Sequence, residues 1–118
     1  MTKLINKQTT QAEYKRRINK ALEFIVENLD QKLSLENIAK ASHFSPFHFH
    51  RIFQSIIGET VNDYVHRKRM EKAASTLVCS STLTITSVAE LLGFSSSANF
   101  SKAFKLYFGV SPSQLRNP

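Results

Sequence analysis

The sequence predicts an all-α fold: a seven-helix bundle of two helix-turn-helix subdomains joined by a long linker helix. Apolar residues recur three and four positions apart along most of the chain, and no segment alternates apolar and polar residues over a useful length. In addition, a helix, a tight turn and a second helix occur twice with closely similar core residues. We expect these two copies at residues 34–58 and 84–109.

The composition is that of a globular chain with a modest core. The 118 residues are 42% hydrophobic and 21% charged, which suits one domain or two very small ones. The longest apolar runs have only a few residues and no signal segment opens the chain, so neither a membrane span nor export is expected. The single cysteine, Cys79, fits a reducing compartment. We therefore expect a cytoplasmic protein.

The first two helices are expected to form a scaffold. Residues 1–9 are polar and expected to fray, and a helix is expected over residues 11–28. Asp30-Gln31-Lys32 is a turn, and Ser34 is the N-cap of a second helix that ends near His43 and Phe44. The expected core positions are Ile18, Leu22, Ile25, Val26 and Leu29 in the first helix and Leu35, Ile38 and Ala39 in the second.

The third helix, residues 45–57, has a marked start and end. Ser45 is a favourable N-cap, Pro46 suits the first helical position, and Gly58 suits the left-handed residue after the last turn. Its core stripe, at the spacing i, i+3, i+4 and i+7, is expected to be Phe49, Ile52, Phe53 and Ile56.

A long helix is expected to start at Thr60, with Asp63 completing a shortened capping box, and to run to about Val78. Its roughly 18 residues would span about 27 Å. Further helices are expected over residues 85–92 and 97–108, and a capping box at Ser111-Pro112-Ser113-Gln114 predicts a last short turn of helix. The sixth helix is expected to bury Phe100, Ala103, Phe104 and either Tyr107 or Phe108.

The two copies share core and turn residues. Leu35, Ile38, Ala39, Phe44 and Ser45 recur 50 residues later as Ile85, Val88, Ala89, Phe94 and Ser95. After one extra residue in the turn, Phe49, Phe53 and Gly58 recur 51 residues later as Phe100, Phe104 and Gly109. We therefore expect an N-terminal helix-turn-helix subdomain at residues 10–58, a linker helix at 60–79 and a C-terminal subdomain at 84–116.

The outward positions of the two copies differ, and they carry groups that can contact DNA. They are Phe47, His50, Arg51 and Gln54 in the first copy, and Ala98, Ser101, Lys102 and Lys105 in the second. Amide, imidazole and guanidinium groups hydrogen-bond base edges in a major groove. The net charge of +7 favours nucleic acid over an anionic membrane as the partner. Solvated basic faces would explain the charge alone, but not the repeat.

A helix-turn-helix places its second helix in the major groove, and successive half-sites lie about 34 Å apart. A connecting helix about 27 Å long is of the right scale for two such helices to address adjacent major-groove segments of double-stranded DNA. We expect the two outward faces to point the same way and the chain to bind as a monomer.

Enzymatic and metal-binding functions find little support. His48 and His50 stand two positions apart, so on a helix they diverge and form no metal pair. The sequence has no glycine-rich phosphate loop, no paired carboxylates in a pocket-forming context and no nucleophile with an orienting base. We expect no enzyme activity, no metal and no cofactor. A helical protein-interaction module would explain the helices, but not the repeat or the outward face.

The sequence resembles the AraC/XylS family of bacterial transcription regulators over about residues 10–116. The segments that carry the resemblance are Ser34-Leu35-Glu36-Asn37-Ile38-Ala39, Phe44-Ser45-Pro46-Phe47-His48-Phe49-His50-Arg51-Ile52-Phe53, Gly58-Glu59-Thr60, Val88-Ala89-Glu90-Leu91-Leu92-Gly93-Phe94-Ser95 and Phe100-Ser101-Lys102-Ala103-Phe104-Lys105-Leu106-Tyr107-Phe108-Gly109-Val110-Ser111-Pro112. The last segment matches the family signature. The resemblance implies seven helices arranged as two homeodomain-like helix-turn-helix units with a linker helix.

In the family, the third and sixth helices contact bases. Carried onto this chain, the base-contacting positions are Phe47, His50 and Arg51, then Ser97, Ala98 and Lys102. The expected contacts to the DNA backbone are Ser45, Gln54, Ser96, Ser101 and Lys105. A bidentate contact from Arg51 to guanine would contribute roughly 1–3 kcal/mol of discrimination. We expect the first copy to supply most of the sequence discrimination, and the second mainly phosphate contacts and an Ala98 contact with a thymine methyl.

The resemblance also implies a regulator that usually activates by recruiting RNA polymerase. Small stand-alone members resemble the MarA/SoxS/Rob group, whereas others carry a separate effector domain. Two interpretations therefore stay open: a stand-alone regulator, and the excised DNA-binding half of a larger effector-responsive one. The operator, the target genes, the inducing signal and the sign of regulation do not follow from the sequence.

Overall fold

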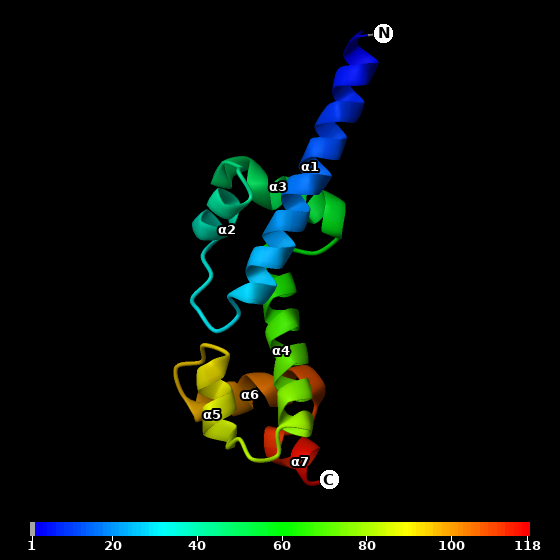
Figure 1. The fold of residues 1–118 in the computed structure, drawn as a ribbon. Coiled ribbons are helices and arrows are strands. Elements are labelled where there is room, and N and C mark those ends of the chain that lie inside the picture. Colours follow the sequence, from blue (N-terminus) through cyan, green and yellow to red (C-terminus); the bar gives the residue numbers. More distant parts are fainter. Residues whose placement is uncertain (1) are drawn as a thin grey trace. The chain divides into compact units, whose positions relative to one another are not determined.

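The computed structural model describes the backbone of residues 2–118 and the side chains from Thr10 onward. This part of the chain folds into seven α-helices and contains no β-strand (Figure 1). The helices are α1 (Thr2–Glu27), α2 (Leu35–Ala41), α3 (Pro46–Ile57), α4 (Val61–Cys79), α5 (Ile85–Leu91), α6 (Ser97–Phe108) and α7 (Pro112–Arg116). The predicted all-α class is confirmed.

The helix α1 begins at Thr2, nine residues before the expected start. No glycine or proline interrupts residues 2–27, so nothing in the sequence stops the helix from extending toward the N-terminus. Met1 and the side chains of residues 2–9 lie outside the described residues. The expected fraying of residues 1–9 concerns this segment and stays a prediction.

The contacts divide the chain into two compact units. Unit 1 comprises residues 1–28 and 33–64, and unit 2 comprises residues 29–32 and 65–118. Unit 1 therefore holds α1, α2, α3 and the first turn of α4, while unit 2 holds the rest of α4 with α5, α6 and α7. The loop after α1, residues 29–32, belongs to unit 2, which the sequence pattern did not indicate.

Unit 1 is built around a row of aromatic rings. The ring pairs Tyr14–Phe44, Phe44–Phe49, Phe49–Phe53 and Phe53–Tyr64 have centroids 5.4–6.0 Å apart. Tilted and edge-to-face arrangements at this distance are favourable for aromatic pairs. The aliphatic residues Ile18, Ala21, Ile25, Ile38 and Ala39 are fully buried beside them.

Three residues predicted for this core are not inside it: Val26, Leu35 and Ile56. Leu35, in the first turn of α2, is 39% exposed. Val26 is 46% exposed because it lies about 80° around α1 from the axis of the Ile18–Ile25–Leu29 stripe, and Ala21 fills the other flank instead. Ile56, in the last turn of α3, is 39% exposed, and its neighbour Ile52 is only half-buried.

Unit 2 has its own core, made by α4, α5 and α6. Its fully buried members are Met70, Ala73, Leu77, Val88, Ala89, Leu92, Phe100 and Phe104. Both Tyr107 and Phe108 are exposed, so the expectation that one of them would be buried is wrong. The last turn of α6 extends past the core, and the Phe108 ring contacts only the edge of the cluster, 4.6 Å from the Phe104 ring centroid.

Capping residues set the helix ends, as the sequence predicts for Ser34, Ser45 and Ser111 but not for Thr84 and Ser96. Ser34, Ser45, Thr84, Ser96 and Ser111 are N-caps whose hydroxyl oxygens accept a backbone N–H of the first turn. Gly58 and Gly109, with φ of +88° and +81°, end α3 and α6 in the left-handed conformation. At Ser111 both hydrogen bonds of the capping box are present.

In the described part of the chain, none of the helices combines the length and the apolar character needed to cross a lipid bilayer.

Candidate nucleic-acid interface

The helix α3 presents three distinct faces. Phe49 and Phe53 are fully buried and fix its inner face. At about 100° per residue, Arg51, Phe47 and Gln54 project from the opposite side, and His50 lies at one edge of this outward stripe, about 80° from the axis of the two rings. Arg51 lies at the other edge of the stripe, next to the remaining flank. The remaining flank carries His48, Ile52, Ser55 and Ile56. The rotation of α3 is therefore set by two phenylalanines, and the outward stripe follows from it.

The outward residues of α3 are held out into solvent. Phe47 is 70% exposed, and His50, Arg51 and Gln54 are also exposed. The His50 Nδ1 atom lies 3.5 Å from the Pro46 carbonyl oxygen, a weak local contact. Arg51 forms no hydrogen bond or ion pair with another described side chain. Four exposed groups on one helix face can therefore engage a partner without first breaking a strong contact.

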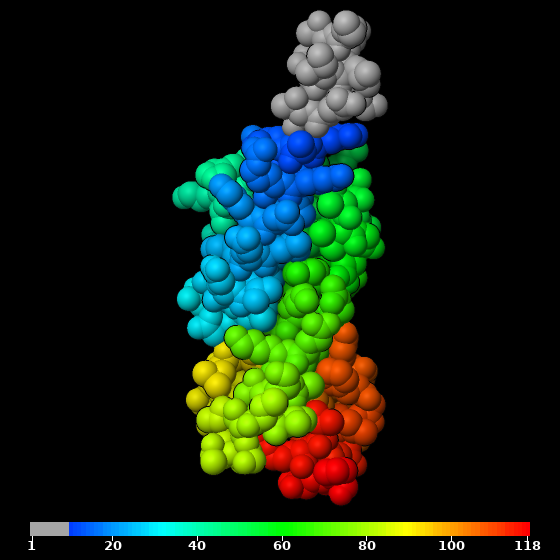
Figure 2. Space-filling model, turned by 45° about the vertical axis from the view of Figure 1, so that its right-hand side comes forward, coloured from blue at the N-terminus to red at the C-terminus, as the bar shows by residue number. Residues whose placement is uncertain are grey.

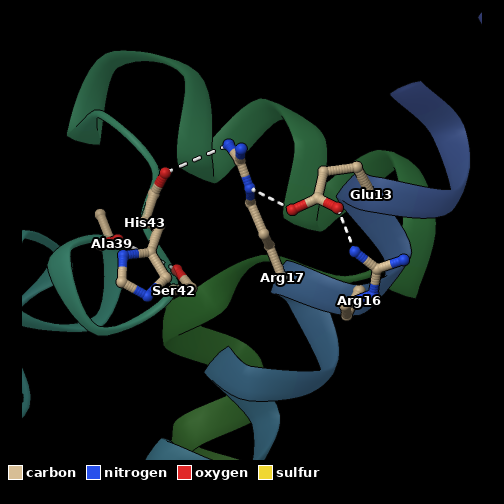
Figure 3. Close-up of polar contacts among 6 residues, drawn as sticks. All are labelled: Glu13, Arg16, Arg17, Ala39, Ser42 and His43. Carbon is tan, nitrogen blue, oxygen red and sulfur yellow. Dashed lines mark hydrogen bonds and ion pairs between the residues drawn. The ribbon is translucent and has the colours of Figure 1, made fainter. Parts of the chain in front are cut away.

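The turn before α3 is fixed by side chains from α1, as Figure 3 shows. His43 has a positive φ of 62°, and the Arg17 Nη1 atom donates to its carbonyl oxygen at 3.2 Å. The Arg17 Nε atom donates to Glu13 Oε1 at 3.2 Å, and Glu13 also pairs with Arg16. The Ser42 hydroxyl, fully buried, donates to the carbonyl oxygens of α2 at Ile38 and Ala39. These contacts set the entry angle of α3 and hence the direction of its outward face.

The helix α6 repeats the arrangement with different outward groups. Phe100 and Phe104 are fully buried, and Ala98, Lys102 and Lys105 are exposed at the positions that match Phe47, Arg51 and Gln54. Ser101, which matches His50, is half-buried. Ser97 is also half-buried, because it lies only about 60° around the helix from Phe100. Of the residues expected at this second face, Ala98 and the two lysines are therefore the accessible ones.

The capping serines Ser45 and Ser96 are exposed at the N-termini of α3 and α6. Each hydroxyl oxygen accepts a backbone N–H, from His48 at 3.4 Å and from Asn99 at 3.0 Å respectively. The hydroxyl proton of each remains available for an anionic acceptor, and helix N-termini favour negative charge. These positions suit phosphate contacts.

Several basic residues hold the fold together instead of facing solvent. Arg69 donates to the carbonyl oxygens of Leu29 at 3.1 Å and Gln31 at 2.6 Å, and burial lowers the pKa of its guanidinium from the ordinary value. Arg116 donates to the carbonyl oxygens of Leu77, Ser80 and Leu83, and so holds the connection between α4 and α5. The net charge of the sequence therefore overstates the charge that is available to a partner.

Sequence reasoning missed these three positioning arginines, Arg17, Arg69 and Arg116, all of which bind main-chain carbonyl groups. The spacing of basic residues in a sequence does not show which of them will face solvent and which will bind a carbonyl group 26 to 40 positions away. Among the described residues, no group of three or more His, Cys, Asp or Glu side chains is placed to hold a metal ion.

Comparisons with known proteins agree with this architecture. Residues 38–118 match the family described as "Helix-turn-helix domain". The chain is 36% identical over 99 residues to the HTH-type transcriptional activator AarP of Providencia stuartii, covering 84% of this chain and 73% of that protein. It is 33% identical over 99 residues to the multiple antibiotic resistance protein MarA of Escherichia coli, covering 84% of this chain and 77% of that protein.

Longer relatives match as well. The chain is 36% identical over 100 residues to the regulatory protein PocR of Salmonella typhimurium, covering 85% of this chain but only 33% of that protein. Two solved structures share the fold. The C-terminal domain of the response regulator AraT of Geobacillus stearothermophilus has a TM-score of 0.78 and 35% identity, over 85% of this chain and 83% of that one. The DNA-binding domain of AdpA, solved with a target DNA, has a TM-score of 0.77 and 24% identity, over 84% of this chain and 88% of that one.

The two helix-turn-helix units, the family match and the identity to relatives of similar length lead to one conclusion. This chain belongs to the AraC-type family of helix-turn-helix DNA-binding transcription regulators.

Proposed function

We propose that α3 and α6 are the two recognition helices of this regulator, and that the chain binds double-stranded DNA as a monomer through two adjacent major-groove segments. The observation that carries the proposal is the outward stripe of α3, where Phe47, His50, Arg51 and Gln54 are all exposed. The same register recurs on α6, with the same pair of buried phenylalanines behind it. The subdomain boundaries at residues 10–58, 60–79 and 84–116 are part of this proposal.

In the first unit, Arg51 is proposed as the main discriminating residue. Its guanidinium can donate two parallel hydrogen bonds to the O6 and N7 atoms of guanine. The His50 imidazole is proposed to contact a neighbouring base edge, and the Phe47 ring a thymine methyl group. Gln54 and Ser45 are proposed to contact phosphates on either side, which positions the helix without reading sequence.

In the second unit, Ala98 is proposed to contact a thymine methyl group, and Lys102 either a base or a phosphate. Lys105, Ser96 and Ser101 are proposed as phosphate contacts, and Ser97 as a base contact. The half-burial of Ser97 and Ser101 leaves the two exposed lysines as the stronger contributors. Phosphate contacts supply affinity with little sequence information, so we expect α6 to contribute less discrimination than α3.

We further propose that the chain activates transcription by contacting RNA polymerase, that it acts on DNA in the cytoplasm, and that it catalyses no reaction. The relative AarP is named a transcriptional activator, and its length is similar to that of this chain. The matched region covers only 33% of PocR, so the activity of that whole protein is not proposed for this chain.

The experiment is selection of bound duplexes from a random pool, followed by titration of the selected and a scrambled duplex at two salt concentrations. If about six phosphates are neutralised, log K should fall against log salt with a slope near −5. Arg51→Ala should lose roughly 1–3 kcal/mol of discrimination at one base pair, whereas Lys105→Ala should weaken all duplexes and lower the slope by about one.

A suitable control is Lys20→Ala, which removes an exposed charge from the side of α1 opposite its buried Ile18 and Ile25. It should leave both affinities within about twofold of the unmodified chain, since its effect is limited to screened long-range attraction. Identical losses for Arg51→Ala and Lys105→Ala on every duplex would contradict the roles proposed for the two residues. Equal affinity for every duplex would contradict sequence-specific binding.

A further inference from the structure

Unit 1 contains an open groove between α1 and α3, which we call the α1–α3 groove. Its volume is about 720 Å³, within the usual range for small-molecule sites. Tyr14 and Lys15 line it from α1, and His48, Arg51, Ile52 and Ile56 line it from α3. In Figure 2, α1 (blue) lies at the surface of unit 1 beside the green segment that ends α3.

The floor of the groove is formed by apolar side chains of α3 that α1 leaves partly exposed. Ile52 and Ile56 have core-type spacing with Phe49 and Phe53, yet Ile52 is half-buried and Ile56 is 39% exposed. Burying the rest of these two side chains would remove more apolar surface from water, so leaving them partly open forgoes stability. A ligand with an apolar body could recover part of that gain.

The rim of the groove is basic and unneutralised. Lys15 and Arg51 line it together with His48, and no Asp or Glu lines it. Neither Lys15 nor Arg51 forms an ion pair with another described side chain. The adjacent Arg16 and Arg17 both pair with Glu13, whereas Lys15 has no acidic partner among the described side chains.

We infer that the α1–α3 groove binds a small amphipathic carboxylate, with the carboxylate held by Lys15 and Arg51 and the apolar body lying against Ile52, Ile56 and Tyr14. An apolar floor with a few convergent polar groups is the usual composition of a small-molecule site. An anion is favoured because cationic groups line the groove and acidic groups do not, and arginine binds carboxylates with good geometry.

Arg51 connects this groove to the outward face of α3, since it lies at the edge of both. The regulatory consequence rests on the proposed function: a carboxylate that engages Arg51 withdraws it from guanine. Ligand and operator then compete for one side chain, and ligand binding lowers operator affinity.

The test uses 1-naphthoate as the carboxylate probe and 1-naphthalenemethanol as its neutral counterpart, each titrated into the DNA-free chain with amide chemical shifts as the readout. We expect saturable binding of 1-naphthoate, with shifts confined to α1 and α3, and at least about fivefold weaker binding of the alcohol. Lys15→Gln and Ile56→Ser should each weaken the binding of 1-naphthoate by about fivefold, since each removes one contact at an open site. Lys20→Gln, the matched change on another face of α1, should leave it unchanged.

Three outcomes overturn the inference: no saturation, equal binding of the alcohol, or equal effects of Lys15→Gln and Lys20→Gln. A Lys15→Gln variant that weakens DNA binding on all duplexes but leaves 1-naphthoate unaffected would instead make the groove a contact for the DNA backbone. Because binding is measured without DNA, a failure of the proposed recognition role of α3 leaves this result intact. Conversely, normal operator binding without 1-naphthoate binding would refute the groove alone.

Discussion

The two helix-turn-helix turns have nearly the same backbone but are stabilised by different chemistry. In unit 1, Phe44 N donates to Ala39 O at 2.9 Å, and in unit 2, Phe94 N donates to Ala89 O at 3.0 Å. The left-handed residue is His43 in the first turn, with φ of 62°, and Gly93 in the second, with φ of 77°. The same turn is thus built once with a side chain at this position and once without.

The surroundings explain why the residues differ. A Cβ atom on Gly93 would lie only 3.1 Å from the Asp30 carbonyl oxygen, so a side chain there would require the Asp30 backbone to move. The His43 side chain is exposed, and the Arg17 guanidinium binds the His43 carbonyl oxygen from the other side. The preceding residues differ as well. Ser42 in the first turn is fully buried and its hydroxyl donates to α2, whereas Leu92 in the second turn is a buried apolar residue. The first turn depends on polar side chains, and the second depends on close backbone packing.

The largest effect expected from this difference is at Gly93. Gly93→Ala should destabilise the protein by roughly 2–4 kcal/mol, because a left-handed alanine costs about 1–2 kcal/mol and the contact with Asp30 adds overpacking. Gly109→Ala is the matched control: its φ is +81° and nothing lies within 4 Å of the added Cβ, so only the left-handed cost of about 1–2 kcal/mol is expected. Urea unfolding measures both. Equal losses would mean that the approach to Asp30 has no energetic weight.

The next effect separates the positioning arginines of the two units. Arg116→Met should cost roughly 2 kcal/mol, because three main-chain carbonyl groups lose a charged donor, whereas Arg17→Met should cost about 1 kcal/mol, because one carbonyl group loses it. Methionine keeps the apolar stem of each side chain. Thermal unfolding of the two variants is the measurement. A larger loss of stability for Arg17→Met than for Arg116→Met would contradict this prediction.

The sequence predicted the number of helices, most of their bounds and the repeat, because caps and apolar spacing are local signals. Ser45, Gly58, Ser96 and Gly109 mark helix ends through contacts within four residues, so no tertiary information was needed. The exposed stripe of α3 followed from the burial of Phe49 and Phe53 by helical geometry alone.

What the sequence did not predict depends on how far neighbouring elements extend. Ile56 has core spacing but lines the open α1–α3 groove, and Tyr107 and Phe108 lie past the end of the unit 2 core. The partners of Arg69 are main-chain carbonyl groups nearly forty residues away, which leave no pattern in the sequence. Which DNA contacts the outward residues make stays a prediction.

A stabilising substitution should sharpen the comparison further. His43→Gly should raise the free energy of unfolding by about 0.5–1 kcal/mol, since relief of the left-handed conformation exceeds the entropy gained by the unfolded chain. The control is Lys40→Gly on α2, where the backbone is helical, and a loss of about 1 kcal/mol is expected. Urea unfolding distinguishes the two signs. A loss at His43 would show that its imidazole contributes contacts beyond those of the turn.

The smallest effect concerns two carboxylates, one in each unit, that each pair with two bases on the same helix. Glu13 precedes Arg16 and Arg17 on α1, whereas Glu71 follows Arg67 and Lys68 on α4. An acid placed before its base agrees with the helix dipole and the reverse order does not. Because Glu13 also orients the arginine that binds His43, Glu13→Gln should cost more than Glu71→Gln, which as a surface pair should cost about 0.3–0.5 kcal/mol.

The acid dependence of Glu71 has a definite sign. The hydrogen bond from Arg67 holds the pKa of the Glu71 carboxyl below its ordinary value, with the charge of Lys68 adding to the effect. A group whose pKa is lower in the folded state stabilises above its unfolded pKa, about 4.3, and that contribution disappears as the pH falls through the folded value. The stability difference between the unmodified chain and Glu71→Gln should therefore be constant from pH 6 to 7 and shrink below about pH 4. Urea unfolding at these pH values measures it, and a difference that persists under acid would assign the cost to lost helix packing instead of charge.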